Sequence, residues 1–286
     1  MGGPGRRGGT VPAAVSQPRV YPPEHHVLRD LGLEIETTAD HTARAWMDVS
    51  HAVAAPWGGV TAGVLATMVD AVCGNLAVFA AVPDRVATAD LALTVLRPAD
   101  GPQIEAAGRV IRRGRTTVVV EVELSDVAWA TATFAVLPQR AETPGPVVGR
   151  PTGRRALLGG SGRPIGRWLG DEIGLAVTDA AAGALSIGLS DYVTNSFGAL
   201  QGGMVAFVAE QAGATAIGAA LGAPATTVDL HIAYLAQCRG GPFHTAATVL
   251  AAADGAGSAT VRIADAGADD RLTTVAHVIA VAGGAP

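Results

Sequence analysis

Residues 58–70 read GGVTAGVLATMVD, and residues 198–210 read GALQGGMVAFVAE. The two stretches align without a gap at an offset of 140 residues (58 to 198), and each passes from a glycine-rich turn into an apolar run that ends in an acid. A second matching pair follows, TADLAL at 88–93 and TVDLHI at 227–232, now offset by 139 residues (88 to 227). Self-similarity at such a fixed distance indicates an internal repeat. The chain is therefore predicted to consist of two copies of one unit in tandem.

Each copy is predicted to contain the same elements in the same order. A strand pair comes first, around 31–49 and 172–189, and a long apolar helix follows the glycine-rich turn. A short proline-containing turn then leads into three closing strands, and residues 116–124 are rich in the Val and Thr that strands favour. A helix that is apolar all round has to be covered all round. We therefore expect an α+β fold in which an antiparallel sheet of about five strands curls around each helix.

Composition divides the chain into four parts. Residues 1–24 begin with a Gly-, Pro- and Arg-rich stretch without an apolar core, so they are predicted to be a disordered leader and not a signal peptide. Residues 139–163 are loaded with Pro, Gly and Arg and are predicted to be a linker. The two repeated units then occupy residues 25–138 and 164–284.

The overall composition excludes several classes of function. The sequence contains no lysine, which excludes a Schiff-base lysine and a phosphate-loop lysine. A formal net charge of −5 argues against a nucleic-acid partner. Cys73 and Cys238 form no CxxC pair, and the seven histidines show no metal-ligand spacing. We therefore expect no metal, no cofactor and no disulfide, with the reducing cytoplasm as the location.

The apolar segments 60–82 and 200–221 are long enough to be compared with membrane spans. Each carries an acid near its middle, which costs about 2.5–3.5 kcal/mol at the centre of a bilayer. We therefore expect both to be helices buried in a soluble core, without membrane contact.

The order of glycine turn, apolar helix, acid and Thr-x-Asp strand resembles the hotdog-fold acyl-CoA thioesterases of the phenylacetate-pathway type. Their fingerprint is approximately Asn-x-x-Gly-x-Leu-His-Gly-Gly, followed by an apolar stretch that ends in Asp. The second copy reads NSFGALQGG at 195–203, and the first reads APWGGVTAG at 55–63. The resemblance implies two tandem hotdog domains, an acyl-CoA substrate, no cofactor, and assembly of such chains into a homo-oligomer.

Both copies depart from this fingerprint. The His is replaced by Gln201 in the second copy and by Thr61 in the first. The first copy also has Ala55 in place of the Asn and Ala62 in place of the first Gly of the pair. The second copy keeps the Asn and both glycines, but its helix acid is Glu210.

In hotdog enzymes of this kind the glycine and the acid that faces it come from opposite units, so the resemblance implies two composite sites. The first combines Asp70 and Thr88 with Asn195, Gln201, Gly202 and Gly203; the second combines Glu210 and Thr227 with Ala55, Thr61, Ala62 and Gly63. Only the first has every matching position filled except the His. It is therefore predicted to be the working site. There the Gly202 N–H polarises the carbonyl, Asp70 activates water or attacks, and Thr88 and Asn195 hold the water or the carboxylate.

Each of these features also has a purely structural interpretation. The two acids could bond a neighbouring backbone group, and Gly202 and Gly203 could simply permit a tight turn. The small residues around each acid favour close helix packing as much as space for an acyl chain. The turn at Arg112, Arg113 and Arg115 could bind the phosphates of coenzyme A or could be a solvated turn.

The sequence thus predicts a metal-independent thioesterase that hydrolyses a small or medium acyl-CoA to the free acid and CoA. The competing prediction is a non-catalytic acyl-CoA binder or sensor, which the missing His favours. A hotdog hydratase would use an Asp–His pair, and no His lies near either helix start.

Overall fold

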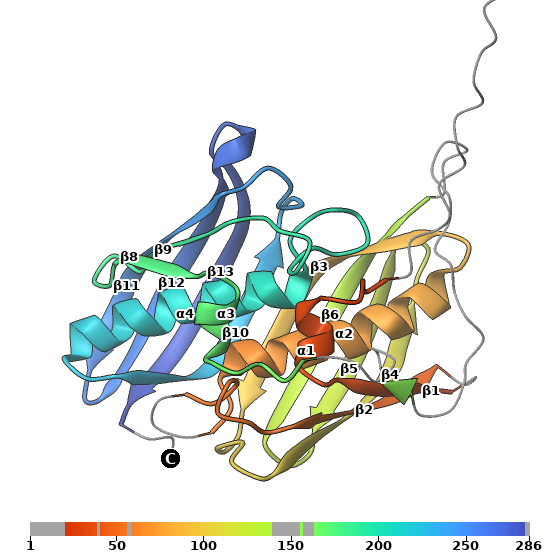
Figure 1. Cartoon of the computed structure of the whole chain (residues 1–286), viewed down its shortest axis with the longest axis horizontal. Coiled ribbons are helices and arrows are strands. Elements are labelled where there is room, and N and C mark those ends of the chain that lie inside the picture. The colour runs from red at the N-terminus through yellow and green to blue at the C-terminus, as the bar shows by residue number, and fades with distance from the viewer. Residues whose placement is uncertain (1–20, 39–40, 56–58, 139–154, 157–162, 284–286) are drawn as a thin grey trace, which may run out of the picture.

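The computed structural model describes residues 21–38, 41–55, 59–138, 155–156 and 163–283. The predicted leader 1–24 and linker 139–163 lie mostly outside these ranges, so the domain boundaries stay predictions. The described strands form one 13-stranded antiparallel sheet, with two long helices lying one after the other across the same side of it (Figure 1).

The elements repeat in the order that the sequence predicts. The first half contains α1 (Val27–Asp30), β1 (Glu34–Thr37), β2 (Thr42–Asp48), α2 (Ala62–Ala81), β3 (Arg85–Val95), β4 (Gln103–Arg113), β5 (Thr117–Leu124) and β6 (Ala128–Leu137). The second half contains α3 (Leu169–Glu172), β8 (Ala176–Asp179), β9 (Ala184–Ile187), α4 (Gly202–Leu221), β10 (Ala225–Tyr234), β11 (Phe243–Ala253), β12 (Ala256–Asp265), η1 (Ala266–Ala268) and β13 (Arg271–Ala282). The short β7 (Arg155–Ala156) lies between them in sequence.

The sheet is symmetric about its centre, where β3 pairs with β10 and joins the two halves. Outward from β3 the order is β6, β5, β4, β2 and β1, and outward from β10 it is β13, β12, β11, β9 and β8; β7 lies beside β1. Each half thus contributes its initial strand pair and four further strands. The sequence predicted about five strands for each half. The matching strand orders agree with the predicted repeat.

The helices α2 and α4 keep the offset of 140 residues (62 to 202) and are both 20 residues long. Each begins two residues later than its apolar segment, because the side chains of Thr61 and Gln201 accept the N–H groups of Val64 and Met204 as N-caps. Both helices are long and apolar enough to cross a membrane by length and composition, yet most of each is buried inside the fold. Their burial agrees with the prediction of core helices.

The first turns of α2 and α4 lie directly against each other, and two glycines permit this approach. A Cβ atom added at Gly203 would lie 2.5 Å from the Cα of Thr67, and one added at Gly63 would lie 2.7 Å from the Cα of Phe207. The Thr67 hydroxyl also donates to the carbonyl oxygen of Gly203 at 3.0 Å. For these two glycines, close helix packing is therefore the role that the structure supports.

Candidate active site

The carboxylate of Asp70, in the middle of α2, reaches the N-terminus of α4. Its Oδ2 accepts the Gln201 side-chain amide at 2.7 Å and the Gly203 N–H at 3.1 Å, while its Oδ1 accepts the Thr88 hydroxyl at 2.9 Å. These contacts bring together residues that the sequence placed in the first composite site. The charge is compensated by three donors and by the positive end of the α4 dipole.

The Asp70 cluster is tightly filled. Only 7% of Asp70 is exposed, and a Cβ atom added at Gly202 would lie 2.7 Å from Asp70 Oδ1. The carbonyl oxygen of Gly202 in turn accepts the Tyr234 hydroxyl at 3.0 Å. Burial raises the pKa of Tyr234 well above its usual value, so this phenol stays protonated as a donor. The glycine at position 202 is therefore needed to let the carboxylate approach the helix end.

The burial of the Asp70 carboxylate predicts a pH-dependent effect of Asp70→Asn on stability. Burial raises the pKa of Asp70 to about 6, so the folded state binds its proton more tightly than the unfolded state does. The free energy of unfolding that depends on this group is therefore lost as pH rises from about 4 to about 6. The substituted amide would keep an acceptor for Gly203 and Gln201, and its N–H could donate to the Thr88 hydroxyl. We expect the variant to gain roughly 1–3 kcal/mol over the native chain at pH 8.

The measurement is urea unfolding of both proteins at pH 4, 6 and 8. The gain should vanish near pH 4, where both proteins carry a neutral side chain at this position. A loss of stability at pH 8, or a difference that does not change with pH, would contradict this account of Asp70.

The carboxylate of Glu210 on α4 makes the equivalent approach to the N-terminus of α2. Its Oε1 accepts the Thr227 hydroxyl at 2.8 Å, its Oε2 accepts the Gln211 side-chain amide at 2.7 Å, and it accepts the Gly63 N–H. Only 3% of Glu210 is exposed, and burial raises its pKa to about 7. A carboxyl group with this pKa exchanges its proton near neutral pH, as a general base does.

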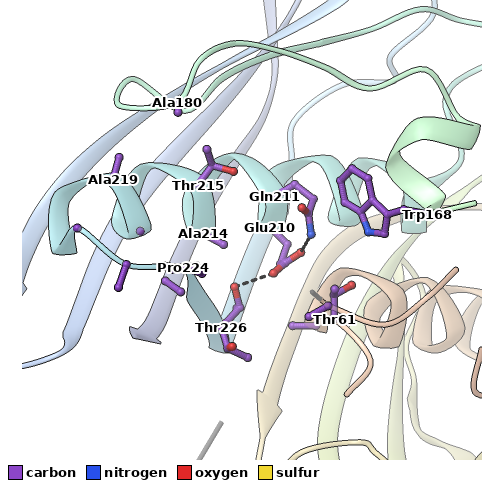
Figure 2. Close-up of a pocket in the computed structure, with 17 residues that line it drawn as sticks. Thr61, Trp168, Ala180, Glu210, Gln211, Ala214, Thr215, Ala219, Pro224 and Thr226 are labelled. Carbon is purple, nitrogen blue, oxygen red and sulfur yellow. Dashed lines mark hydrogen bonds between the residues drawn. The ribbon is translucent and has the colours of Figure 1, made fainter. Parts of the chain in front are cut away.

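A cavity of about 460 Å³ opens beside Glu210, and Figure 2 shows the carboxylate within it, between Thr61 and the row of small residues on α4. The lining comes from the loop before α2, the start of α2, the residue before α3, the β8–β9 turn, α4, the α4–β10 turn and the start of β10. It comprises Ala55, Thr61, Ala62, Trp168, Ala180, Glu210, Gln211, Ala214, Thr215, Gly218, Ala219, Gly222, Ala223, Pro224, Ala225, Thr226 and Thr227. None of the residues that hold the Asp70 carboxylate belongs to this lining.

The start of α2 also lines this cavity, through Thr61 and Ala62. Ala62 is the first residue of α2, and within the described part of the chain its N–H has no hydrogen-bond acceptor. The first N–H groups of a helix have no partner inside the helix and carry the positive end of its dipole. A carbonyl oxygen bound beside Glu210 could therefore accept this N–H.

Two groups of predicted residues lie elsewhere. The Asn195 side-chain oxygen accepts the N–H groups of Phe197 and Ala199 at 2.9 and 3.1 Å, so it closes its own turn. The sequence had instead predicted that Asn195 holds the water or the Asp70 carboxylate. Arg112, Arg113 and Arg115 are exposed at the β4–β5 turn, where Arg113 donates to the carbonyl of Ala80 at the end of α2. None of these arginines lines the cavity.

The sequence had not singled out three residues that shape these sites. Gln211 bonds Glu210, Tyr234 bonds the Gly202 carbonyl, and Trp168 borders the cavity before α3. The first copy has Ala71 at the position of Gln211. This difference between the two copies is the sequence feature that could have identified Gln211. In the described ranges no group of three or more His, Cys, Asp or Glu residues could hold a metal ion.

Comparisons with known proteins bear on the family and the fold. Residues 58–128 match the family model described as the thioesterase superfamily, whereas no curated protein matches the chain. In fold the chain is similar to the tesB protein of Mycobacterium avium subspecies paratuberculosis, at 14% identity and a TM-score of 0.60, over 91% of this chain and 97% of that one.

Two further solved structures extend the likeness in fold. An acyl-ACP thioesterase from Bacteroides thetaiotaomicron shares 11% identity at a TM-score of 0.56, over 84% of this chain and 98% of that one. A protein with a hot dog fold from Alicyclobacillus acidocaldarius shares 11% identity at a TM-score of 0.52, over 91% of this chain and 98% of that one. In sequence over residues 58–128, and in fold over most of its length, the chain is consistent with a hotdog-fold thioesterase.

Proposed function

We propose that this protein is a double-hotdog thioesterase that hydrolyses acyl-CoA thioesters to the free acid and CoA, with Glu210 as the catalytic carboxylate. The thioesterase family match and the thioesterases among its fold neighbours support thioester hydrolysis in general. The observation that carries the proposal is a buried carboxylate that lines a cavity together with Ala62, the first residue of α2, whose N–H bonds no acceptor among the described residues. The Asp70 cluster has the fuller motif, but its carboxylate lies outside this cavity.

The proposed reaction uses residues that line the cavity. The thioester carbonyl oxygen accepts the Ala62 N–H, which stabilises the negative charge that develops on that oxygen. Glu210 takes a proton from a water molecule as the water oxygen bonds to the carbonyl carbon. The tetrahedral intermediate then collapses, its C–S bond breaks, and the departing CoA sulfur takes the proton from Glu210. The bonds from Thr227 and Gln211 position the carboxylate throughout.

This mechanism predicts a simple pH profile for kcat/KM. Because the base must be ionised and burial raises the pKa of Glu210 to about 7, activity should rise about tenfold per pH unit below pH 7. It should level off above pH 8, where the carboxylate is fully ionised. Initial rates of thiol release between pH 5.5 and 8.5 would test this. A profile that is flat across this range, or that falls above pH 6, would argue against Glu210 as the base.

One observation favours a second function, acyl-CoA binding without turnover. The first copy carries Ala62 at the position of Gly202, so a methyl group stands where the donor meets the carbonyl. Acyl-CoA binding measured by calorimetry, together with no thiol release, would establish this alternative and overturn the proposed hydrolysis.

We also propose that the protein acts in the cytoplasm as a homo-oligomer of double-hotdog chains, as the resemblance implies. Both cysteines are buried and unpaired, which fits a reducing compartment. Light scattering of the purified protein would measure its assembly.

A further inference from the structure

The cavity beside Glu210 is elongated along α4. Its α4 residues follow helical spacing, namely Glu210, Gln211, Ala214, Thr215, Gly218 and Ala219, and the C-cap Gly222 continues the row. At about 1.5 Å per residue, the stretch from Glu210 to Gly222 spans roughly 18 Å. Figure 2 shows Glu210 at one end of this row, with Ala214, Thr215 and Ala219 leading away from it and Pro224 opposite. The space therefore has the length of an extended chain and one reactive end.

The residues that line the cavity favour an apolar ligand. Beyond Glu210, Gln211 and Thr227, the described lining residues are mainly alanine and glycine, and their polar groups are the hydroxyls of Thr61, Thr215 and Thr226 and the indole N–H of Trp168. None of the described lining residues is a lysine or an arginine. A pantetheine arm would bring two amide groups that need partners, because a buried amide without a hydrogen bond is costly. A hydrocarbon chain has no such requirement.

The repeat provides an internal comparison for the width of this space. At the offset of 140 residues, the α2 residues equivalent to Gly218 and Ala219 are the larger Val78 and Phe79, whereas Asn75 is about the size of Thr215 and Gly74 is smaller than Ala214. Asn75 is also tied to β1, because its side-chain oxygen accepts the Thr37 hydroxyl at 2.9 Å. The second copy thus has smaller residues than the first at positions 218 and 219, toward the far end of this helix face.

We infer that this cavity binds the acyl chain of the substrate, and that the small residues of α4 set the chain length it accepts. The inference rests on the proposed function and names its substrate class: a linear, uncharged acyl group whose thioester lies beside Glu210. An extended chain advances about 1.2 Å per bond, so the roughly 18 Å of the cavity hold up to about fifteen carbons. Each buried methylene should raise kcat/KM about fourfold until the cavity is full.

The test is the ratio of kcat/KM for dodecanoyl-CoA to that for acetyl-CoA, measured by thiol release below the micelle-forming concentration. In Ala214→Leu the new side chain would occupy the cavity about 6 Å along α4 from Glu210. The ratio should fall at least about 100-fold in this variant. Ala219→Leu, near the far end, should lower only the activity on the longest chains. Ala220→Leu is the matched control, because Ala220 is exposed on the same helix and does not line the cavity.

The outcomes separate this inference from the proposed function. An unchanged ratio in a folded Ala214→Leu protein would overturn the inference and leave hydrolysis standing, as would an equal loss on both substrates. If the native protein hydrolyses no acyl-CoA, the proposed function fails instead. Calorimetric titration of native and Ala214→Leu protein with dodecanoate then decides the inference, since the variant should bind at least about tenfold more weakly. Thr215→Leu repeats the test if Ala214→Leu does not fold.

Discussion

Replacing Glu210 by Gln is expected to lower kcat for acyl-CoA hydrolysis by about 10²–10³-fold, because a positioned general base contributes about that much. The amide keeps the size of the side chain and an oxygen that can accept from Thr227 or Gly63, so binding should change less than turnover. The readout is thiol release under saturating substrate, with KM determined in the same experiment. The reduced rate should also lose its rise near pH 7.

Asp70→Asn is the matched control for this substitution, because it makes the same change in the other cluster. Asp70 does not line the cavity, so the variant should keep kcat within about threefold of the native value. If Asp70→Asn loses turnover and Glu210→Gln keeps it, the reaction takes place at Asp70, in the cluster that has more of its motif positions filled.

A large loss of stability is expected from Gly203→Ala, at the contact between α2 and α4. Gly203→Ala would place its Cβ 2.5 Å from the Cα of Thr67, and this backbone atom cannot move away as a flexible side chain would. Either the helices separate or the Gly203 N–H loses its bond to Asp70. We expect the free energy of unfolding to fall by about 2–4 kcal/mol, in the range of severe overpacking. Urea unfolding at pH 7 measures this.

Gly188→Ala serves as the control for the glycine substitution. Gly188 is exposed, and a Cβ atom added there meets nothing within 4 Å. The control should change the unfolding free energy by less than about 0.5 kcal/mol. Equal stabilities for the two variants would show that the close helix approach at Gly203 is not needed for the fold.

Much of the architecture follows from the sequence because it depends on local pattern. The offset between the two glycine-helix-acid stretches predicted two equivalent halves, and the helices α2 and α4 match the expected apolar segments to within two residues at each end. The partners of Asp70 also followed from the repeat and the resemblance, since Thr88, Gln201 and Gly203 all bond its carboxylate.

The choice between the two sites could not be made in this way. Motif matching favours Asp70, because the second copy supplies the glycine pair that the first copy lacks. The cavity instead depends on packing between segments distant in sequence, such as Trp168, Ala180 and Pro224, none of which carries a motif. Asn195 illustrates the same limit: it occupies its motif position, yet its side-chain oxygen is used within its own turn.

The most direct test of the account is a crystal structure of the Glu210→Gln protein with intact dodecanoyl-CoA. We predict that the acyl chain lies along α4 in the cavity and that the thioester oxygen lies about 2.7–3.1 Å from the Ala62 nitrogen. A thioester bound instead at Gly202 beside Asp70, with the cavity at position 210 empty, would contradict the account.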